Sequence, residues 1–117
     1  MPTVHVFVST GRFSSFAEMR KFIDPTYTDD GDMVPSPFIN EVRLTSYEPE
    51  CIEAVHAPGP KPLHDLLHGV SHGEQWLHLV DPSVVASEAI CVFEPNHPIR
   101  PTESSMHYCG RYYYRGE

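Results

Sequence analysis

The clearest pattern of hydrophobic and polar positions lies in residues 3–9, where Val4, Val6 and Val8 occupy every second position. Alternation of β-branched side chains is typical of a strand. Phe7 is apolar as well, and it belongs to the opposite face. Because both faces carry apolar side chains, we predict a central strand.

Two short helices are predicted after this strand. The first begins at a capping box in residues 15–18, whose side chains can satisfy free amides of the first turn. It ends at Asp24, because the residue before a proline avoids the helical region. The second covers residues 38–42, with Ser36 as its cap and Pro37 at its first position.

The remaining pattern predicts short strands with further helices between them. Extended segments are expected at residues 43–47, 51–56, 89–93 and 106–115. Residues 57–62 form a proline-rich connector, Pro62 opens a helix, and a capping box at residues 71–74 starts another. We therefore predict an α+β fold: a single domain over residues 1–117, with a mainly antiparallel sheet of four to five strands and two to three helices packed on one face.

Composition narrows the class of protein. The chain has 117 residues, the length of one domain, and no apolar run near the ~18 residues of a membrane span. Its start lacks the basic and apolar regions of a signal peptide, so a cytoplasmic location is expected. Three cysteines without C-x-x-C spacing indicate reduced core thiols rather than a disulfide framework or a zinc site.

Charge is concentrated in one segment. The net charge is −8, and residues 24–53 contribute −7 of it through eight acidic side chains and one arginine. Such a balance argues against nucleic acid or an anionic membrane as the partner, and it favours a basic protein whose approach is steered by the field. We expect the functional surface in this segment.

Histidines suggest a different function. His64, His68 and His72 follow one another at intervals of four residues, a spacing that can hold a transition metal on an unbroken helix. Gly69 and the capping box after it should interrupt that helix, so exposed polar positions are the favoured interpretation and no metal ligand is assigned. A small metal-binding protein remains the alternative.

Catalytic signals are weak. Asp29, Asp30 and Asp32 with their glycine lack the later bidentate glutamate of a calcium loop. The carboxylates of residues 48–53 would be split between two faces of a strand. Because no nucleophile elbow and no phosphate loop occur, we predict no catalytic residue and no cofactor.

The last predicted strand is rich in tyrosine. We place Tyr108, Tyr112 and Tyr114 on one face and Arg111 and Tyr113 on the other. Tyrosine is enriched at protein interfaces. A protein-interaction module of unrelated purpose, using this strand, is therefore a third hypothesis.

Short motifs in the first half of the chain resemble a known family. They are Gly11-Arg-Phe13, Tyr27, Asp30-Gly-Asp32, Ser36-Pro-Phe38, and Tyr47-Glu-Pro-Glu50 with Ile52-Glu53. Their order is similar to that of the immunity protein 22 family of bacterial polymorphic toxin systems, over Val4 to Glu53. This chain departs from the family in lacking a tryptophan before Gly11 and in having Pro49 after Glu48. The resemblance implies an α+β protein, not an enzyme, that binds and neutralises a cognate toxin.

Charge and resemblance together define a hypothesis for the interface. An acidic face would occlude a basic active site, such as that of a nuclease, with Tyr27 and Tyr47 as aromatic anchors. The residues assigned to this partner-binding face are Tyr27, Asp29, Asp30, Asp32, Tyr47, Glu48, Glu50 and Glu53.

Overall fold

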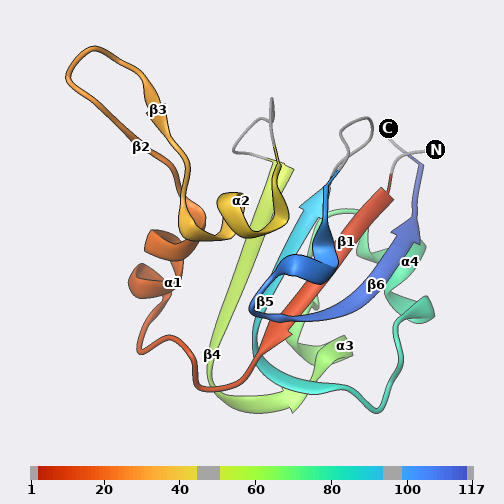
Figure 1. The fold of residues 1–117 in the computed structure, drawn as a ribbon. Coiled ribbons are helices and arrows are strands. Elements are labelled where there is room, and N and C mark those ends of the chain that lie inside the picture. Colours follow the sequence, from red (N-terminus) through yellow and green to blue (C-terminus); the bar gives the residue numbers. More distant parts are fainter. Residues whose placement is uncertain (1–2, 45–50, 94–98, 116–117) are drawn as a thin grey trace.

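A four-stranded antiparallel sheet forms the centre of the molecule (Figure 1). The structure is a computed structural model that describes residues 3–44, 51–93 and 99–115. The strand order is β4-β5-β1-β6, and the strands are β1 (Thr3–Ser9), β4 (Ile52–Pro62), β5 (Val85–Phe93) and β6 (His107–Tyr113). The predicted α+β class is confirmed, and β1 has a neighbour on each side, as a central strand must.

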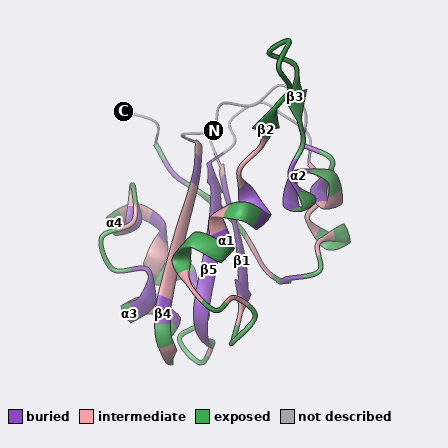
Figure 2. Cartoon of the chain, turned by 90° about the vertical axis from the view of Figure 1, so that its left-hand side faces the viewer, coloured by how far each residue is buried: buried purple, intermediate pink, exposed green. Residues whose placement is uncertain are grey.

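Helices cover both faces of this sheet, whereas the sequence had suggested one (Figure 2). The first layer holds α1 (Phe16–Ile23) and α2 (Pro37–Val42), and the second holds α3 (Leu63–Leu66) and α4 (Gly73–Trp76). Alternation along β1 explains the difference. Its valines pack under α3 and α4, while Phe7 packs under α1 and α2.

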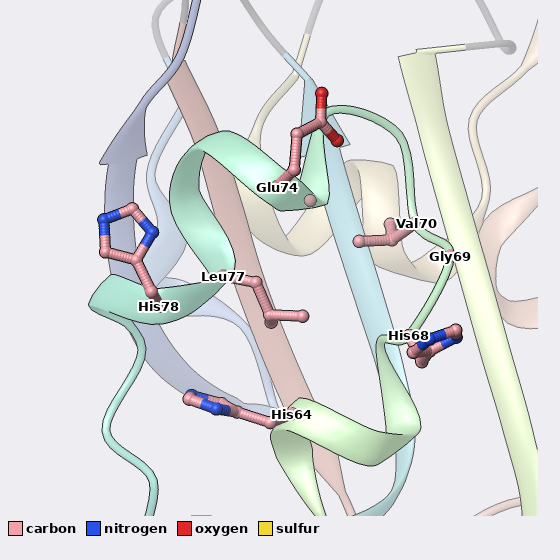
Figure 3. Close-up of a pocket in the computed structure, with 8 residues that line it drawn as sticks. His64, His68, Gly69, Val70, Glu74, Leu77 and His78 are labelled. Atoms are coloured by element: carbon pink, nitrogen blue, oxygen red, sulfur yellow. The ribbon is translucent and has the colours of Figure 1, made fainter.

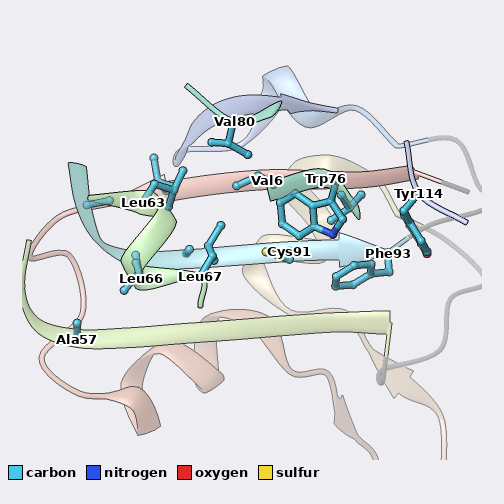
Figure 4. Packing of buried hydrophobic residues seen from close by; sticks show 14 residues of the cluster. Val6, Ala57, Leu63, Leu66, Leu67, Trp76, Val80, Cys91, Phe93 and Tyr114 are labelled. Carbon is cyan, nitrogen blue, oxygen red and sulfur yellow. The ribbon is translucent and has the colours of Figure 1, made fainter. Parts of the chain in front are cut away.

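The core under α3 and α4 is built around Trp76, which is fully buried beside Leu67 and Phe93 (Figure 4). The 3₁₀ turn η2 (Leu77–Leu79) follows α4, and η3 (Pro101–Glu103) precedes β6. In the part of the chain that the structure describes, no helix is long and apolar enough to cross a membrane.

Local capping signals were predicted correctly in the first layer and wrongly in the second. Ser15 and Ser36 each accept a hydrogen bond from a backbone N–H three residues on, at 3.1 Å. Ser71 does not cap α4. The residue before that helix is His72, which has a left-handed backbone (φ 57°) and no capping bond through its side chain. The N–H of Ser71 instead reaches the Glu53 carboxylate.

The predicted connector at residues 57–62 belongs to β4. The ladder with β5 shifts register between His56 and Lys61, so Pro58 and Pro60 fall where pairing is interrupted, while Pro62 pairs with Val85. Because β4 is an edge strand, missing N–H groups are tolerated on its outer side.

A bulge in β6 divides the tyrosines between the two faces. Val6 pairs with Gly110 and Phe7 with Tyr108, which leaves Cys109 as an extra residue. Tyr108 therefore packs beside Phe7, whereas Tyr112 packs in the opposite layer beside Trp76, so the shared face we predicted is wrong. Of the four tyrosines in residues 108–114, Tyr113 alone is exposed, which weakens the hypothesis of a tyrosine-rich binding surface.

Candidate partner-binding site

An exposed hairpin joins α1 to α2 and projects from the body of the molecule (Figures 1 and 2). It consists of β2 (Thr26–Tyr27) and β3 (Met33–Val34), and every residue from 26 to 35 is exposed. Neither core cluster of the described chain includes a hairpin residue. A two-stranded hairpin without a buried face is marginally stable on its own. It contributes little to the stability of the fold, which makes it a candidate for binding.

The turn of this hairpin is defined by three hydrogen bonds. The Thr28 carbonyl accepts from the Gly31 N–H at 2.9 Å, and the Thr28 N–H donates to the Asp32 carbonyl at 2.9 Å. The Asp32 N–H donates to the Thr28 hydroxyl at 3.1 Å. Gly31 has φ 87°, so a type I turn is followed by a glycine bulge. This geometry places Asp29 and Asp30 at the tip.

The carboxylates at the tip are electrostatically uncompensated. Asp29, Asp30 and Asp32 are exposed, and none of them forms an ion pair with a described residue. The sequence has no lysine or arginine between residues 24 and 42. The hairpin therefore presents a concentrated negative field to solvent.

Exposed apolar side chains lie next to these acids. Tyr27 is 61% exposed, Met33 and Val34 are each 44% exposed, and Tyr27 pairs directly with Met33. Met33 and Val34 were missed by the sequence analysis. They could have been found from the turn: a five-residue turn at 28–32 brings residue 33 opposite Tyr27. Apolar anchors beside charged residues are typical of binding surfaces.

The other assigned residues do not join this group in the described structure. Glu53 lies on β4, and its carboxylate accepts a hydrogen bond at 3.2 Å from the N–H of Ser71, on the side of α3 and α4. Tyr47, Glu48 and Glu50 lie outside the described residues. The structure thus brings together Tyr27, Asp29, Asp30 and Asp32.

Two histidines of the metal hypothesis, His64 and His68, line a hollow of about 580 Å³ between α3 and α4 (Figure 3). His64 Nε2 hydrogen-bonds to the Val80 carbonyl at 2.9 Å, and His72 stacks on Tyr114 outside the hollow. Across the described ranges, no three His, Cys, Asp or Glu side chains are grouped so that they could hold a metal ion. The arrangement gives the metal hypothesis no support.

A second hollow, of about 380 Å³, lies beside the buried carboxylate of Glu88. One carboxylate oxygen accepts from the Ser9 hydroxyl at 2.6 Å and the Arg12 N–H at 3.1 Å, and the other from the Phe13 N–H at 2.8 Å. His56 Nε2 lies 3.6 Å from the second oxygen. These hydrogen bonds hold the turn after β1 in place. Because both carboxylate oxygens are already engaged, Glu88 has little capacity left to bind a ligand.

All three cysteines lie in the described part of the chain, and none forms a disulfide; Cys91 is buried, and Cys51 and Cys109 are partly buried against the core. Burial raises the pKa of the Cys91 thiol well above its usual range, and burial also raises the pKa of Cys109. Neither is an activated nucleophile, since reactivity requires the thiolate.

Comparison with known proteins identifies the family. The sequence profile of the family described as Immunity protein 22 matches residues 6–85, more than half of the chain. The match runs from β1 to the first residue of β5 and includes the hairpin. Neither the curated proteins nor the solved structures that were compared give a match. The chain belongs to the immunity protein 22 family, and an immunity function follows from that membership.

Proposed function

We propose that this protein binds a cognate bacterial toxin and neutralises it by filling a basic active-site cleft with the hairpin of residues 26–35. One observation carries the proposal: a projecting, fully exposed element combines three uncompensated carboxylates with a paired tyrosine and methionine. A projecting element fits a concave site, and its charge fits a basic one.

Occlusion requires no chemistry from the inhibitor. A nuclease cleft is basic because it holds phosphates. Carboxylates of Asp29, Asp30 and Asp32 would take the places of those phosphates and accept charge-assisted hydrogen bonds from arginine or lysine. The charge also accelerates the encounter, while close contact with Tyr27 and Met33 slows dissociation.

Side chains, rather than backbone edges, would make these contacts. Thr28 and Asp32 form the hydrogen-bonded pair at the turn, so Tyr27 and Met33 direct their own N–H and carbonyl groups outward. The next outward positions are Pro25 and Pro35, which have no N–H. Prolines at these positions oppose the addition of a partner strand to either edge.

The experiment compares two charge reversals of equal size. The binding variant is Asp29→Lys with Asp30→Lys, and the control is Asp65→Lys with Glu74→Lys, two exposed acids on α3 and α4. The probe is a catalytically inactive form of the toxin domain encoded beside this chain's gene. Growth rescue against the active toxin is the second readout.

We expect the binding variant to lose both co-purification and rescue, and the control to keep them. Net charge changes from −8 to −4 in both variants, so a general charge effect would appear equally in the two. Equal binding by the two variants would contradict the role of the hairpin.

A further inference from the structure

Exposed apolar side chains cluster on one continuous stretch of the chain. In the described ranges, seven large apolar side chains are exposed, and four of them lie between residues 16 and 34. They are Phe16, Tyr27, Met33 and Val34. Phe16 is the first residue of α1, and the hairpin begins shortly after that helix ends. The cluster therefore spans the outer side of α1 and the hairpin.

On the outer side of α1, the apolar side chain of Phe16 lies beside charged side chains that pair with one another. Phe16, Arg20 and Asp24 are spaced four residues apart, so they form one stripe along the helix. The Arg20 guanidinium lies 5.9 Å from the centre of the Phe16 ring and hydrogen-bonds to the Asp24 carboxylate, with Nε to Oδ2 at 3.0 Å. Lys21 pairs with Glu18 at 3.0 Å. Charge on this helix is thus satisfied locally, while Phe16 remains 48% exposed.

The hairpin alone is small for a stable interface, because specific interfaces involve about 20–30 residues on each side. The contact surface has to continue onto a neighbouring element. On α2, Pro37 and Asn40 are exposed but offer no large apolar side chain. On α1, Phe16 does.

We propose that the toxin-contact surface extends from the hairpin along the outer side of α1, with Phe16 as a second apolar anchor. This inference rests on the proposed function and adds a partner chemistry to it. The toxin would carry a basic cleft for the tip and, beside it, an uncharged apolar pocket. Eight helical residues span about 12 Å, so that pocket would lie at least one short helix length from the cleft.

The test uses Phe16→Ala, with Leu79→Ala as the matched control. Leu79 is 56% exposed, and it lies in η2, on the other side of the sheet. Binding of the same inactive toxin domain is followed by biolayer interferometry. We expect dissociation of Phe16→Ala to be about tenfold faster, as for an interface anchor, with association within about twofold of wild type. The control should match wild type in both rates.

A conservative variant separates contact from folding. Phe16→Met keeps an apolar side chain of similar reach, and it should restore most of the slow dissociation if contact area is the cause. Wild-type protein that does not bind the toxin at all would overturn the proposed function and this inference together. Wild-type binding with Phe16→Ala dissociating like Leu79→Ala would overturn this inference alone.

Discussion

Tyr27 lies directly opposite Met33 across the β2–β3 ladder, on a hairpin that buries neither side chain in the core. The turn hydrogen bond between Thr28 and Asp32 makes Tyr27 and Met33 a non-hydrogen-bonded pair, in which cross-strand side chains approach most closely. The result is an apolar patch directly behind an acidic tip. These two parts of the hairpin should affect binding kinetics in different ways.

The acidic tip should control association. We expect Asp29→Asn with Asp30→Asn to slow association with the toxin at low salt, because the substitutions remove steering charge and keep the side-chain size. Dissociation should change less. Stopped-flow measurements from about 50 to about 500 mM salt would show a shallower salt dependence for the variant. A slope equal to that of wild type would contradict the steering role.

The apolar pair should control dissociation. Truncating it with Tyr27→Ala and Met33→Ala removes contact area without altering charge, so dissociation should accelerate by about tenfold or more. Because both residues are exposed, the midpoint of urea unfolding should stay near that of wild type. An exposed pair from elsewhere, Leu79→Ala with Val85→Ala, is the control. Wild-type dissociation by the double variant would contradict an anchoring role.

The turn itself can be loosened without touching either part. Gly31 has φ 87°, and no atom of the described residues lies within 4 Å of the place its Cβ would take, so substitution is opposed by backbone strain rather than by a clash. We expect Gly31→Val to disrupt pairing of β2 with β3, seen as lost cross-strand NOEs, and to weaken toxin binding. Gly31→Asn should retain both, since asparagine tolerates the left-handed region. The unfolding free energy should hardly change in either variant, because the hairpin is not part of the core.

Elements encoded by neighbouring residues were predictable from the sequence. The caps at Ser15 and Ser36, the end of α1 at Asp24 and the alternation of β1 all depend on contacts within a few residues. Local pattern was also sufficient to place the acids in a turn around Gly31. It could not show that the whole segment projects from the molecule, because projection is defined by what does not pack against it.

Long-range pairing explains what the sequence did not reveal. The bulge at Cys109 changes which tyrosines face which layer, and only the register against β1 creates it. Likewise, β4 continues through its prolines because β5 pairs on both sides of the interruption. Glu53 points toward α3 and α4 because of its position on that strand, which separates it from the acids of the hairpin. Charge along a sequence therefore overestimates how many acids share one surface.

The buried carboxylate of Glu88 should be a major determinant of stability. It accepts hydrogen bonds from the Arg12 and Phe13 N–H groups. In Glu88→Gln the side-chain amide NH₂ would face one of these N–H groups, so two donors would meet and that N–H would lose its acceptor. An unsatisfied buried N–H costs about 1–3 kcal/mol, and a lost charge-assisted bond adds to that. Urea unfolding should show a loss of this order. Glu53→Gln, at a half-exposed position where the carboxylate accepts a hydrogen bond from the Ser71 N–H, should lose much less.

Stability should fall in mild acid because of His5. Burial, with a smaller effect from the nearby Arg111 charge, lowers the pKa of His5 from 6.5 to about 4. Between these values the unfolded chain binds the proton and the folded chain does not. The contribution of neutral His5 to the free energy of unfolding is therefore complete above pH 6.5. It is lost as pH falls toward 4, by about 3 kcal/mol in total. Urea unfolding at several pH values in this range should show the decline for wild type.

His5→Gln removes the titrating ring and keeps a polar group near the Tyr108 hydroxyl, which lies 3.0 Å from His5 Nδ1. Its unfolding free energy should be lower at pH 7 but flatter across the range, and an equally steep decline in the variant would assign the acid sensitivity to other groups.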